Sequence, residues 1–197
     1  MEKHVLGLEL PTDPRWVDIA QKNIEDILVD HAYCEQKAAS SGISIIVQYP
    51  EKEKLVEVLT EIVAEEWSHF ERVLGELKKR GMKLGQKRKD EYVIKLTAII
   101  KQGGSREHQV VEKLLIHALI EARSCERFRL LWKEIPDPGL SEFYYELMVS
   151  EAGHYKTFLS LAKHYMDPDV VELRWREILA QESEIIKNLE VRGDRMH

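Results

Sequence analysis

Two motifs of the form Glu-x-x-His constrain this chain more than any other feature: Glu66 to His69 and Glu151 to His154. Residues three apart project from the same side of a helix, so each motif can offer a carboxylate oxygen and an imidazole nitrogen to one metal ion. Neither motif is His-Glu-x-x-His, the helical pattern of zinc proteases. The chain is therefore expected to form helices that carry metal ligands from two separate parts of the sequence.

Apolar residues at helical spacing place both motifs on buried helix faces. They are Leu55, Leu59, Ile62, Phe70, Val73 and Leu77 around the first motif, and Phe143, Tyr144, Leu147, Phe158 and Leu161 around the second. Charged groups on a buried face are costly unless they are paired or bound to metal. This favours metal binding, with buried Glu–His ion pairs in a purely structural bundle as the alternative.

The same periodicity, with Pro and Gly at its interruptions, predicts the secondary structure. Four long helices are expected at residues 14–47, 51–80, 105–134 and 138–165, a short helix at 91–102 and a last helix at 168–189. No run alternates like a strand. The final residues, 192–197, are expected to be loose.

A long connection separates the second and third long helices, as in ferritin-like bundles. We therefore predict an all-α fold: a ferritin-like four-helix bundle with a short crossover helix and an extra C-terminal helix. Residues 1–197 are expected to form one domain, with the core bundle at 14–165.

The metal sites of such bundles add one carboxylate from each of two further helices. Glu35 is the candidate on the first long helix, because small residues share its face, and Asp30 is the second choice. The third long helix offers Glu121 or Glu126. Along the sequence, the spacing between Glu35 and Glu66 nearly equals the spacing between Glu121 and Glu151, which favours Glu121 as the ligand. The repeated Cys-Glu pair, Cys34-Glu35 and Cys125-Glu126, favours Glu126 instead.

The predicted metal ligands are thus Glu35, Glu66, His69, Glu121, Glu151 and His154, with Glu126 as the alternative to Glu121. Oxygen and imidazole ligands without thiolate suit iron or manganese better than zinc or copper. Open coordination positions would admit dioxygen, so the metal pair itself is the expected catalytic group. The residues that could orient these ligands are Asp30, His31, Tyr33 and Arg123, and each has an ordinary bundle hydrogen bond as its alternative role.

Composition limits the other possibilities. The formal net charge of −6 does not indicate nucleic-acid binding, so such a partner would need a local basic patch. The chain has two cysteines and no Cys-x-x-Cys, which is typical of a reducing cytoplasm. No signal peptide or membrane-spanning apolar run is evident, so a cytoplasmic protein without a membrane partner is expected.

Several strings resemble one known family. They are His31-x-x-Cys34-Glu35-x-Lys37-Ala38-Ala39, Glu66-x-x-His69-Phe70, Ile120 to Phe128, and Phe143-Tyr144 through Ser150-Glu151-x-x-His154-Tyr155. They look like the tRNA hydroxylase family called MiaE, and the resemblance spans most of the chain. One departure is Gly153, where a larger residue is expected.

The resemblance implies a ferritin-like enzyme with two iron ions that uses O₂ to hydroxylate the isopentenyl group of a hypermodified adenosine next to the tRNA anticodon. Electrons must come from an external donor, a separate reductase or ferredoxin, because the chain has no dinucleotide fingerprint and no cluster cysteines. The sequence leaves the oligomeric state open between monomer and dimer.

A basic segment between the second long helix and the short helix is the expected phosphate contact for tRNA. Its cations are Lys79, Arg80, Lys83, Lys87, Arg88 and Lys89, with Lys101 and Arg106 as helpers and Arg127 on the third long helix. A solvated loop without a ligand is the alternative. Rival functions for the whole chain are a ferritin-like protein that binds and oxidises iron, and a di-iron hydroxylase of a lipid or quinone.

Overall fold

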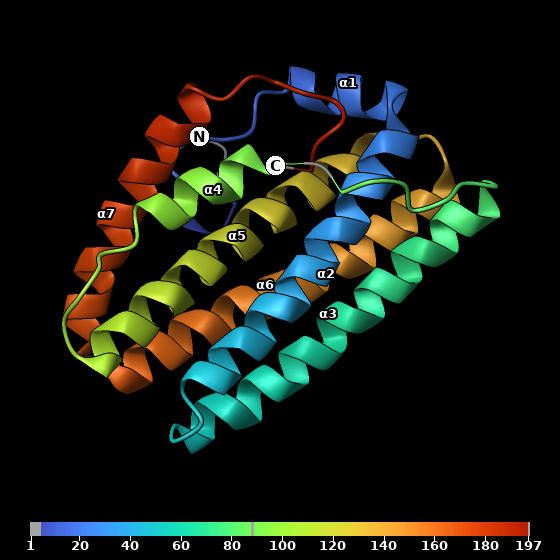
Figure 1. The fold of residues 1–197 in the computed structure, drawn as a ribbon. Coiled ribbons are helices and arrows are strands. Elements are labelled where there is room, and N and C mark those ends of the chain that lie inside the picture. The colour runs from blue at the N-terminus through green and yellow to red at the C-terminus, as the bar shows by residue number, and fades with distance from the viewer. Residues whose placement is uncertain (1–4, 88, 197) are drawn as a thin grey trace. The chain divides into compact units, whose positions relative to one another are not determined.

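The computed structural model describes residues 5–87 and 89–196, and in these residues it contains helices and no strand (Figure 1). The elements are the 3₁₀ turn η1 (Val5–Gly7) and the helices α1 (Arg15–Lys22), α2 (Ile24–Gln48), α3 (Glu53–Lys79), α4 (Glu91–Ala98), α5 (Arg106–Glu134), α6 (Pro138–Tyr165) and α7 (Pro168–Lys187). None of these helices combines the length and the apolar character that crossing a bilayer requires.

Contacts divide the described chain into two compact units. The α2–α3 unit comprises residues 19–87, 89 and 192–196, and the α5–α6 unit comprises residues 5–18 and 90–191. Each unit is built around one pair of long helices that run side by side. Each pair carries one of the two Glu-x-x-His motifs.

Capping residues explain where three helices begin. The Ser105 hydroxyl accepts a hydrogen bond from the His108 amide at the start of α5. Asp137 and Asp167 do the same for the first amides of α6 and α7, and each is followed by proline at the first helical position. These starts agree with the sequence prediction, because capping depends on residues within one turn.

The predicted helix at 14–47 is interrupted in the structure. Asn23 separates α1 from α2 with a φ of −126°, outside the helical range. Its side-chain amide donates to the Ile19 carbonyl at 2.8 Å, and its backbone N–H bonds to Ala20. A side chain that competes for backbone carbonyls in this way favours a break over a continuous helix.

The short helix α4 also ends earlier than predicted, at Ala98 instead of residue 102. The reason is tertiary. Arg174 of α7 donates to the Ile99 carbonyl at 2.9 Å, and the Lys101 amide donates to Glu112 of α5 at 2.9 Å. The backbone groups that would continue α4 are bound by side chains of other helices.

The C-terminal segment 192–196 is not loose, contrary to the sequence expectation. The Met196 amide donates to the buried Asp30 carboxylate of α2 at 2.8 Å, and the Met196 side chain is fully buried. Gly193 lies so close to Ile19 that a Cβ atom would collide with it. Residue 197, the end of the predicted loose segment, lies outside the described residues.

Candidate functional site

In the α2–α3 unit, the helix pair brings three predicted ligands together. Glu35 of α2 and Glu66 and His69 of α3 are all buried, and one donor atom from each lies within 4.8 Å of the others. His69 Nδ1 is 3.7 Å from Glu35 Oε2 and 3.9 Å from Glu66 Oε2. The i,i+3 spacing sets the two α3 residues on one side, and packing against α2 supplies the third.

His31 holds Glu35 within this cluster. Its Nε2 lies 2.6 Å from Glu35 Oε1, one helical turn along α2, and its side chain is fully buried. The other oxygen of Glu35 is the one that faces His69. A hydrogen bond to one carboxylate oxygen restricts the direction of the other. The role of His31 in orienting a metal ligand stays a prediction.

The α5–α6 unit contains a matching cluster. Glu121 of α5 and Glu151 and His154 of α6 are buried, with one donor atom from each within 4.8 Å of the others. His154 Nδ1 lies 3.7 Å from Glu151 Oε2. The two units therefore repeat the same arrangement: a Glu-x-x-His motif on one helix and a glutamate on its neighbour.

The chemistry of both clusters fits a divalent metal. Each combines two carboxylates with one imidazole in a buried place, where two negative charges repel one another unless a cation lies between them. The donor set is oxygen and nitrogen, and it contains no thiolate. Such ligands suit iron or manganese better than the softer metals.

Glu126, the alternative helix ligand, faces a different group of partners. Its carboxylate accepts hydrogen bonds from the Thr12 amide at 3.0 Å and the Thr12 hydroxyl at 2.6 Å. Arg123 Nη1 donates to the same carboxylate at 2.5 Å. Glu126 thus ties the N-terminal segment to α5, whereas Glu121 lies with Glu151 and His154.

Arg123 is the centre of a buried ion network. It is fully buried, and besides Glu126 it binds Glu182 of α7 at 2.7 Å and the Leu10 carbonyl at 2.9 Å. Burial raises the pKa of Glu182, although the Arg123 charge opposes this, and the Tyr92 hydroxyl donates to the same carboxylate. The sequence prediction missed Glu182 and Thr12, which lack any local signal because their partners are distant in sequence.

Two other predicted orienting residues bind chain segments. Asp30 accepts from Met196, as described above, and its other oxygen is 4.0 Å from Arg195 Nε. The Tyr33 hydroxyl donates to the Gly85 carbonyl at 2.8 Å, in the basic segment. These contacts attach the C-terminal and basic segments to α2.

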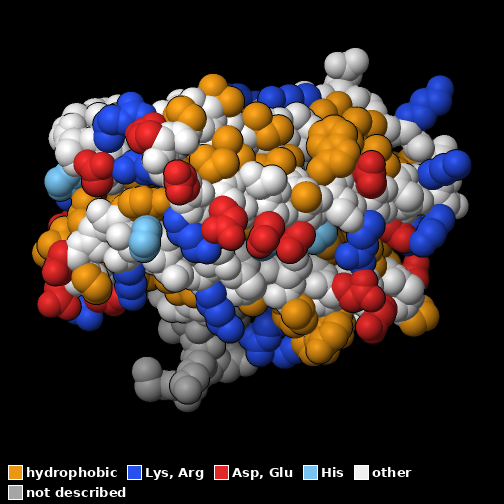
Figure 2. Space-filling view, turned by 90° about the horizontal axis from the view of Figure 1, so that it is seen from below, with side chains coloured by type: hydrophobic (Ala, Val, Ile, Leu, Met, Phe, Trp, Pro, Cys, Tyr) orange, Lys and Arg blue, Asp and Glu red, His pale blue; other side chains and the backbone are white. Residues whose placement is uncertain are grey.

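The predicted RNA-binding cations form an ion-paired group and an exposed group. Lys79 and Arg80 are ion-paired with Glu76 at 2.5 and 2.6 Å, and Lys101 is paired with Glu177. Lys83, Lys87 and Lys89 are exposed, as is Arg106, and Arg88 lies outside the described residues. On the face drawn in Figure 2, basic side chains alternate with acidic and apolar ones.

Arg127 is the exception among these cations, because it is buried. Its guanidinium carbon lies 4.7 Å from the centre of the Trp16 ring, a cation–π contact. Burial, with the nearby charge of Arg123, lowers the pKa of Arg127 to about 10, so it stays protonated at neutral pH. Its charge is thus held inside the protein, against Trp16.

Comparison with known proteins gives concordant results. The family described as tRNA-(MS[2]IO[6]A)-hydroxylase (MiaE) matches residues 1–197. A Pseudomonas putida protein named tRNA 2-(methylsulfanyl)-N(6)-isopentenyladenosine(37) hydroxylase is 35% identical, covering 92% of this chain and 87% of that protein. A Salmonella typhimurium protein of the same name is 25% identical, covering 83% and 77%.

A solved structure is also similar over nearly its whole length. It is described as protein 43 with aldehyde deformylating oxygenase activity from Synechococcus, and it is 33% identical with a TM-score of 0.91, covering 96% of this chain and 94% of that one. The predicted all-α, ferritin-like fold is confirmed by this likeness together with the helix order.

Proposed function

The chain belongs to the MiaE family of tRNA hydroxylases, and on that basis we propose that it hydroxylates the isopentenyl group of a hypermodified adenosine in tRNA. The observation that carries the proposal is the pair of buried Glu–Glu–His clusters, which lie on the motifs that the family resemblance singled out. In a purely structural bundle, burying the same set of two carboxylates and one imidazole twice would cost free energy without a cation to offset it.

We propose that the two clusters hold two iron ions. The ligands would be Glu35, Glu66, His69, Glu121, Glu151 and His154. When bound, the metal pair supplies the activation of dioxygen. The substrate C–H bond is replaced by C–OH, and the second oxygen atom leaves as water after two electrons and two protons are delivered. In this proposal a separate reductase or ferredoxin provides the electrons.

The chain's own residues prepare the site for this reaction. His31 directs one oxygen of Glu35 toward His69, so the carboxylate is oriented before metal binds. All six proposed ligands are buried, which keeps bulk water from competing with the ligands for metal. The paired spacing of Glu and His on α3 and α6 lets each helix present its two ligands without backbone adjustment.

The test is reconstitution of the protein with ferrous iron without oxygen, followed by oxygen, a chemical reductant and prenylated tRNA, with nucleosides analysed by mass. We expect a product heavier by one oxygen atom. His69→Ala and His154→Ala should each lower the bound iron. His164→Ala, an exposed histidine of the same helix as His154, is the matched control and should not. Unchanged iron content in both ligand variants would contradict the assignment.

The similarity to a structure named for aldehyde deformylating oxygenase activity supports a second candidate. The same reconstituted protein should therefore be given a long-chain aldehyde, with formate measured. Formate release in place of nucleoside hydroxylation would favour this candidate. It would leave the metal clusters as described and replace the RNA substrate.

A further inference from the structure

A surface pocket lies on α5 and α6, and none of the proposed metal ligands is among the residues that line it. Its volume is about 450 Å³, and it is lined by Cys125, Arg129, Met148, Val149, Ala152, Gly153 and Lys156. All of these belong to the α5–α6 unit. Gly153 stands between Glu151 and His154 in the motif, and a Cβ atom there would meet nothing within 4 Å. The pocket is therefore open at a turn of α6 that also carries metal ligands.

The floor of this pocket is apolar and uncharged. Cys125 is buried, and its thiol donates to the Met148 carbonyl at 3.4 Å. Burial, with the nearby charge of Glu151, raises the pKa of Cys125 to about 12, so the thiol stays neutral at physiological pH. Val149 exposes 53% of its surface at the side. Such a floor suits a flat or apolar group and not an ion.

Two cations without protein partners flank the pocket. Arg129 and Lys156 are both exposed, and neither forms an ion pair or hydrogen bond with any residue that the structure describes. Lys79 and Arg80, in contrast, share Glu76. Cations that are not neutralised within the protein are available to an anionic partner.

An aromatic pair extends the same surface by about one helical turn. Trp132 of α5 and Tyr145 of α6 have ring centres 4.9 Å apart, tilted by 53°, and Tyr145 is 38% exposed. On α6, Tyr145 lies four residues before the pocket residue Val149. On α5, Trp132 lies three residues after the pocket residue Arg129. Residues at these spacings are neighbours on a helix surface, so the aromatic pair adjoins the pocket. The neighbouring acidic residue Glu146 projects about 100° from Tyr145 around the helix.

We infer that this α5–α6 patch, the pocket with Arg129, Lys156, Trp132 and Tyr145, docks a single-stranded RNA loop. Arg129 and Lys156 contact phosphates, and an unstacked base lies against the aromatic pair and the pocket wall. Cations interleaved with aromatic and apolar surface suit single-stranded RNA better than a duplex, whose bases are not free to stack on protein. The inference rests on the proposed function and places RNA recognition on α5 and α6, in addition to the basic segment.

The probe is an RNA hairpin with a flexible loop, compared with a blunt duplex of equal length, and binding is measured over a series of salt concentrations. Arg129→Ala with Lys156→Ala should weaken hairpin binding about tenfold or more and lower the salt slope by roughly 1.5, since each lost phosphate contact removes about 0.7–0.9. Tyr145→Ala should weaken the hairpin but not the duplex.

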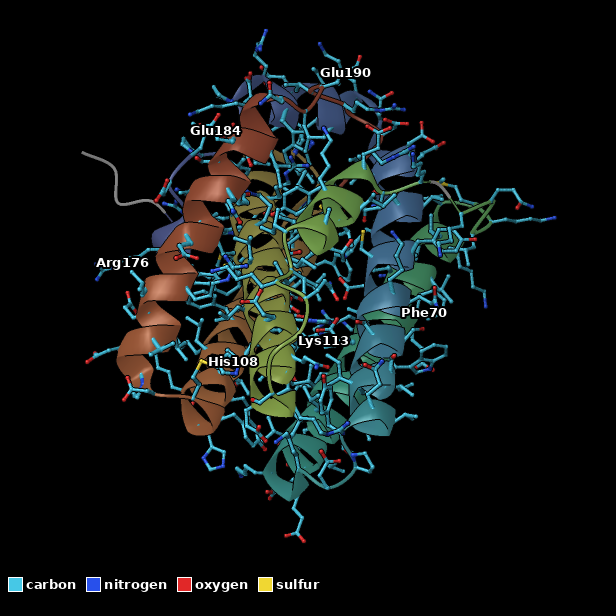
Figure 3. All side chains as sticks on the ribbon, turned by 60° about the vertical axis from the view of Figure 1, so that its left-hand side comes forward. Phe70, His108, Lys113, Arg176, Glu184 and Glu190 are labelled. Carbon is cyan, nitrogen blue, oxygen red and sulfur yellow. The ribbon has the colours of Figure 1, made fainter. Side chains whose placement is uncertain are left out.

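Matched variants separate this patch from general electrostatics. The double variant Lys163→Ala with Arg176→Ala removes two positive charges, as the Arg129 and Lys156 double variant does, but from other positions on α6 and α7. Both of these cations pair with Glu172, and Arg176 points away from α7 (Figure 3). This control should bind like the parent protein. Arg129→Lys with Lys156→Arg keeps the charge and should restore binding, which excludes misfolding as the cause.

Three results would overturn the inference. They are unchanged hairpin binding by the Arg129 and Lys156 double variant, an equal loss in the Lys163 and Arg176 control, or normal RNA binding with slower turnover at limiting electron donor. The last result would assign the patch to an acidic redox protein. Hydroxylation of prenylated tRNA by the parent protein is the separate readout: if no hydroxylated nucleoside forms, the proposed function fails, whatever the RNA-binding results.

Discussion

Replacing Glu126 by Gln should destabilise the protein and leave its metal binding intact. Glu126 accepts from the Thr12 amide, the Thr12 hydroxyl and the Arg123 guanidinium, and all of these groups are buried. Glutamine has one acceptor oxygen and brings an NH₂ group. The Thr12 hydroxyl and Arg123 share one oxygen of Glu126, and the Thr12 amide donates to the other. If the glutamine oxygen takes the shared position, the NH₂ group faces the Thr12 amide, a second donor. In either orientation the buried charge of Arg123 loses one of its two carboxylates.

The size of the effect follows from those contacts. A buried charge-assisted hydrogen bond contributes about 1.5–3 kcal/mol, and removing one partner of a buried ion pair costs about 3–5 kcal/mol. Arg123 keeps Glu182 at 2.7 Å, so the loss is partial. We expect the free energy of unfolding to fall by about 2–4 kcal/mol. For a chain of this size the melting temperature falls roughly 2–4 °C for each kcal/mol.

The assay compares Glu126→Gln with Glu121→Gln, the same change five residues earlier on α5. Melting is followed in metal-free protein, and iron is counted after reconstitution. Glu121→Gln should lose iron yet melt no lower than the parent metal-free protein, because it removes one of two clustered negative charges. Glu126→Gln should melt lower and keep its iron, and hydrogen exchange at the Thr12 amide should become faster.

The reversed pattern would refute the reasoning. If Glu126→Gln loses iron while Glu121→Gln retains it, Glu126 is the ligand, and the Thr12 and Arg123 contacts do not describe the metal-bound protein. If both variants keep iron and melt alike, neither glutamate has the role assigned to it.

Three further predictions follow from single contacts. His31→Ala should weaken iron binding about ten- to hundredfold without unfolding the protein, measured by competition with a chelator, because Glu35 loses its orienting partner. Gly153→Ala should raise the free energy of unfolding by about 1 kcal/mol in thermal melts, since the helix gains propensity and the added Cβ meets open space. Burial alone would raise the pKa of Glu76, but hydrogen bonds from Lys79 and Arg80 lower it below 4.5. The ionised Glu76 carboxylate stabilises the protein above pH 4.5, and this stabilisation is lost as the pH falls through the lowered pKa. Glu76→Gln should therefore lower the free energy of unfolding, measured with urea, by about 1 kcal/mol at pH 7 and leave it unchanged at strongly acid pH.

Local chemistry made much of this protein predictable from its sequence. The starts of α5, α6 and α7 depend on Ser105, Asp137 and Asp167, which bind amides within the next turn. The Glu-x-x-His motifs are equally local, because a helix sets residues three apart on one side whatever surrounds it. The same locality explains the wrong expectation at Asn23, where the side chain breaks a helix that the apolar pattern would continue.

Contacts between distant residues decided the rest. Glu121 and Glu126 lie about 140° apart around one helix, and both border apolar residues, so periodicity cannot rank them as ligands. Their partners come from elsewhere in the α5–α6 unit: Glu151 and His154 lie with one, and Thr12 and Arg123 with the other. Because most of these partners are distant in sequence, the apolar pattern around Glu121 and Glu126 does not reveal them. Only the folded structure shows which carboxylate each partner contacts. For the same reason Asp30 and Tyr33, which the sequence placed near a metal, were found holding Met196 and Gly85.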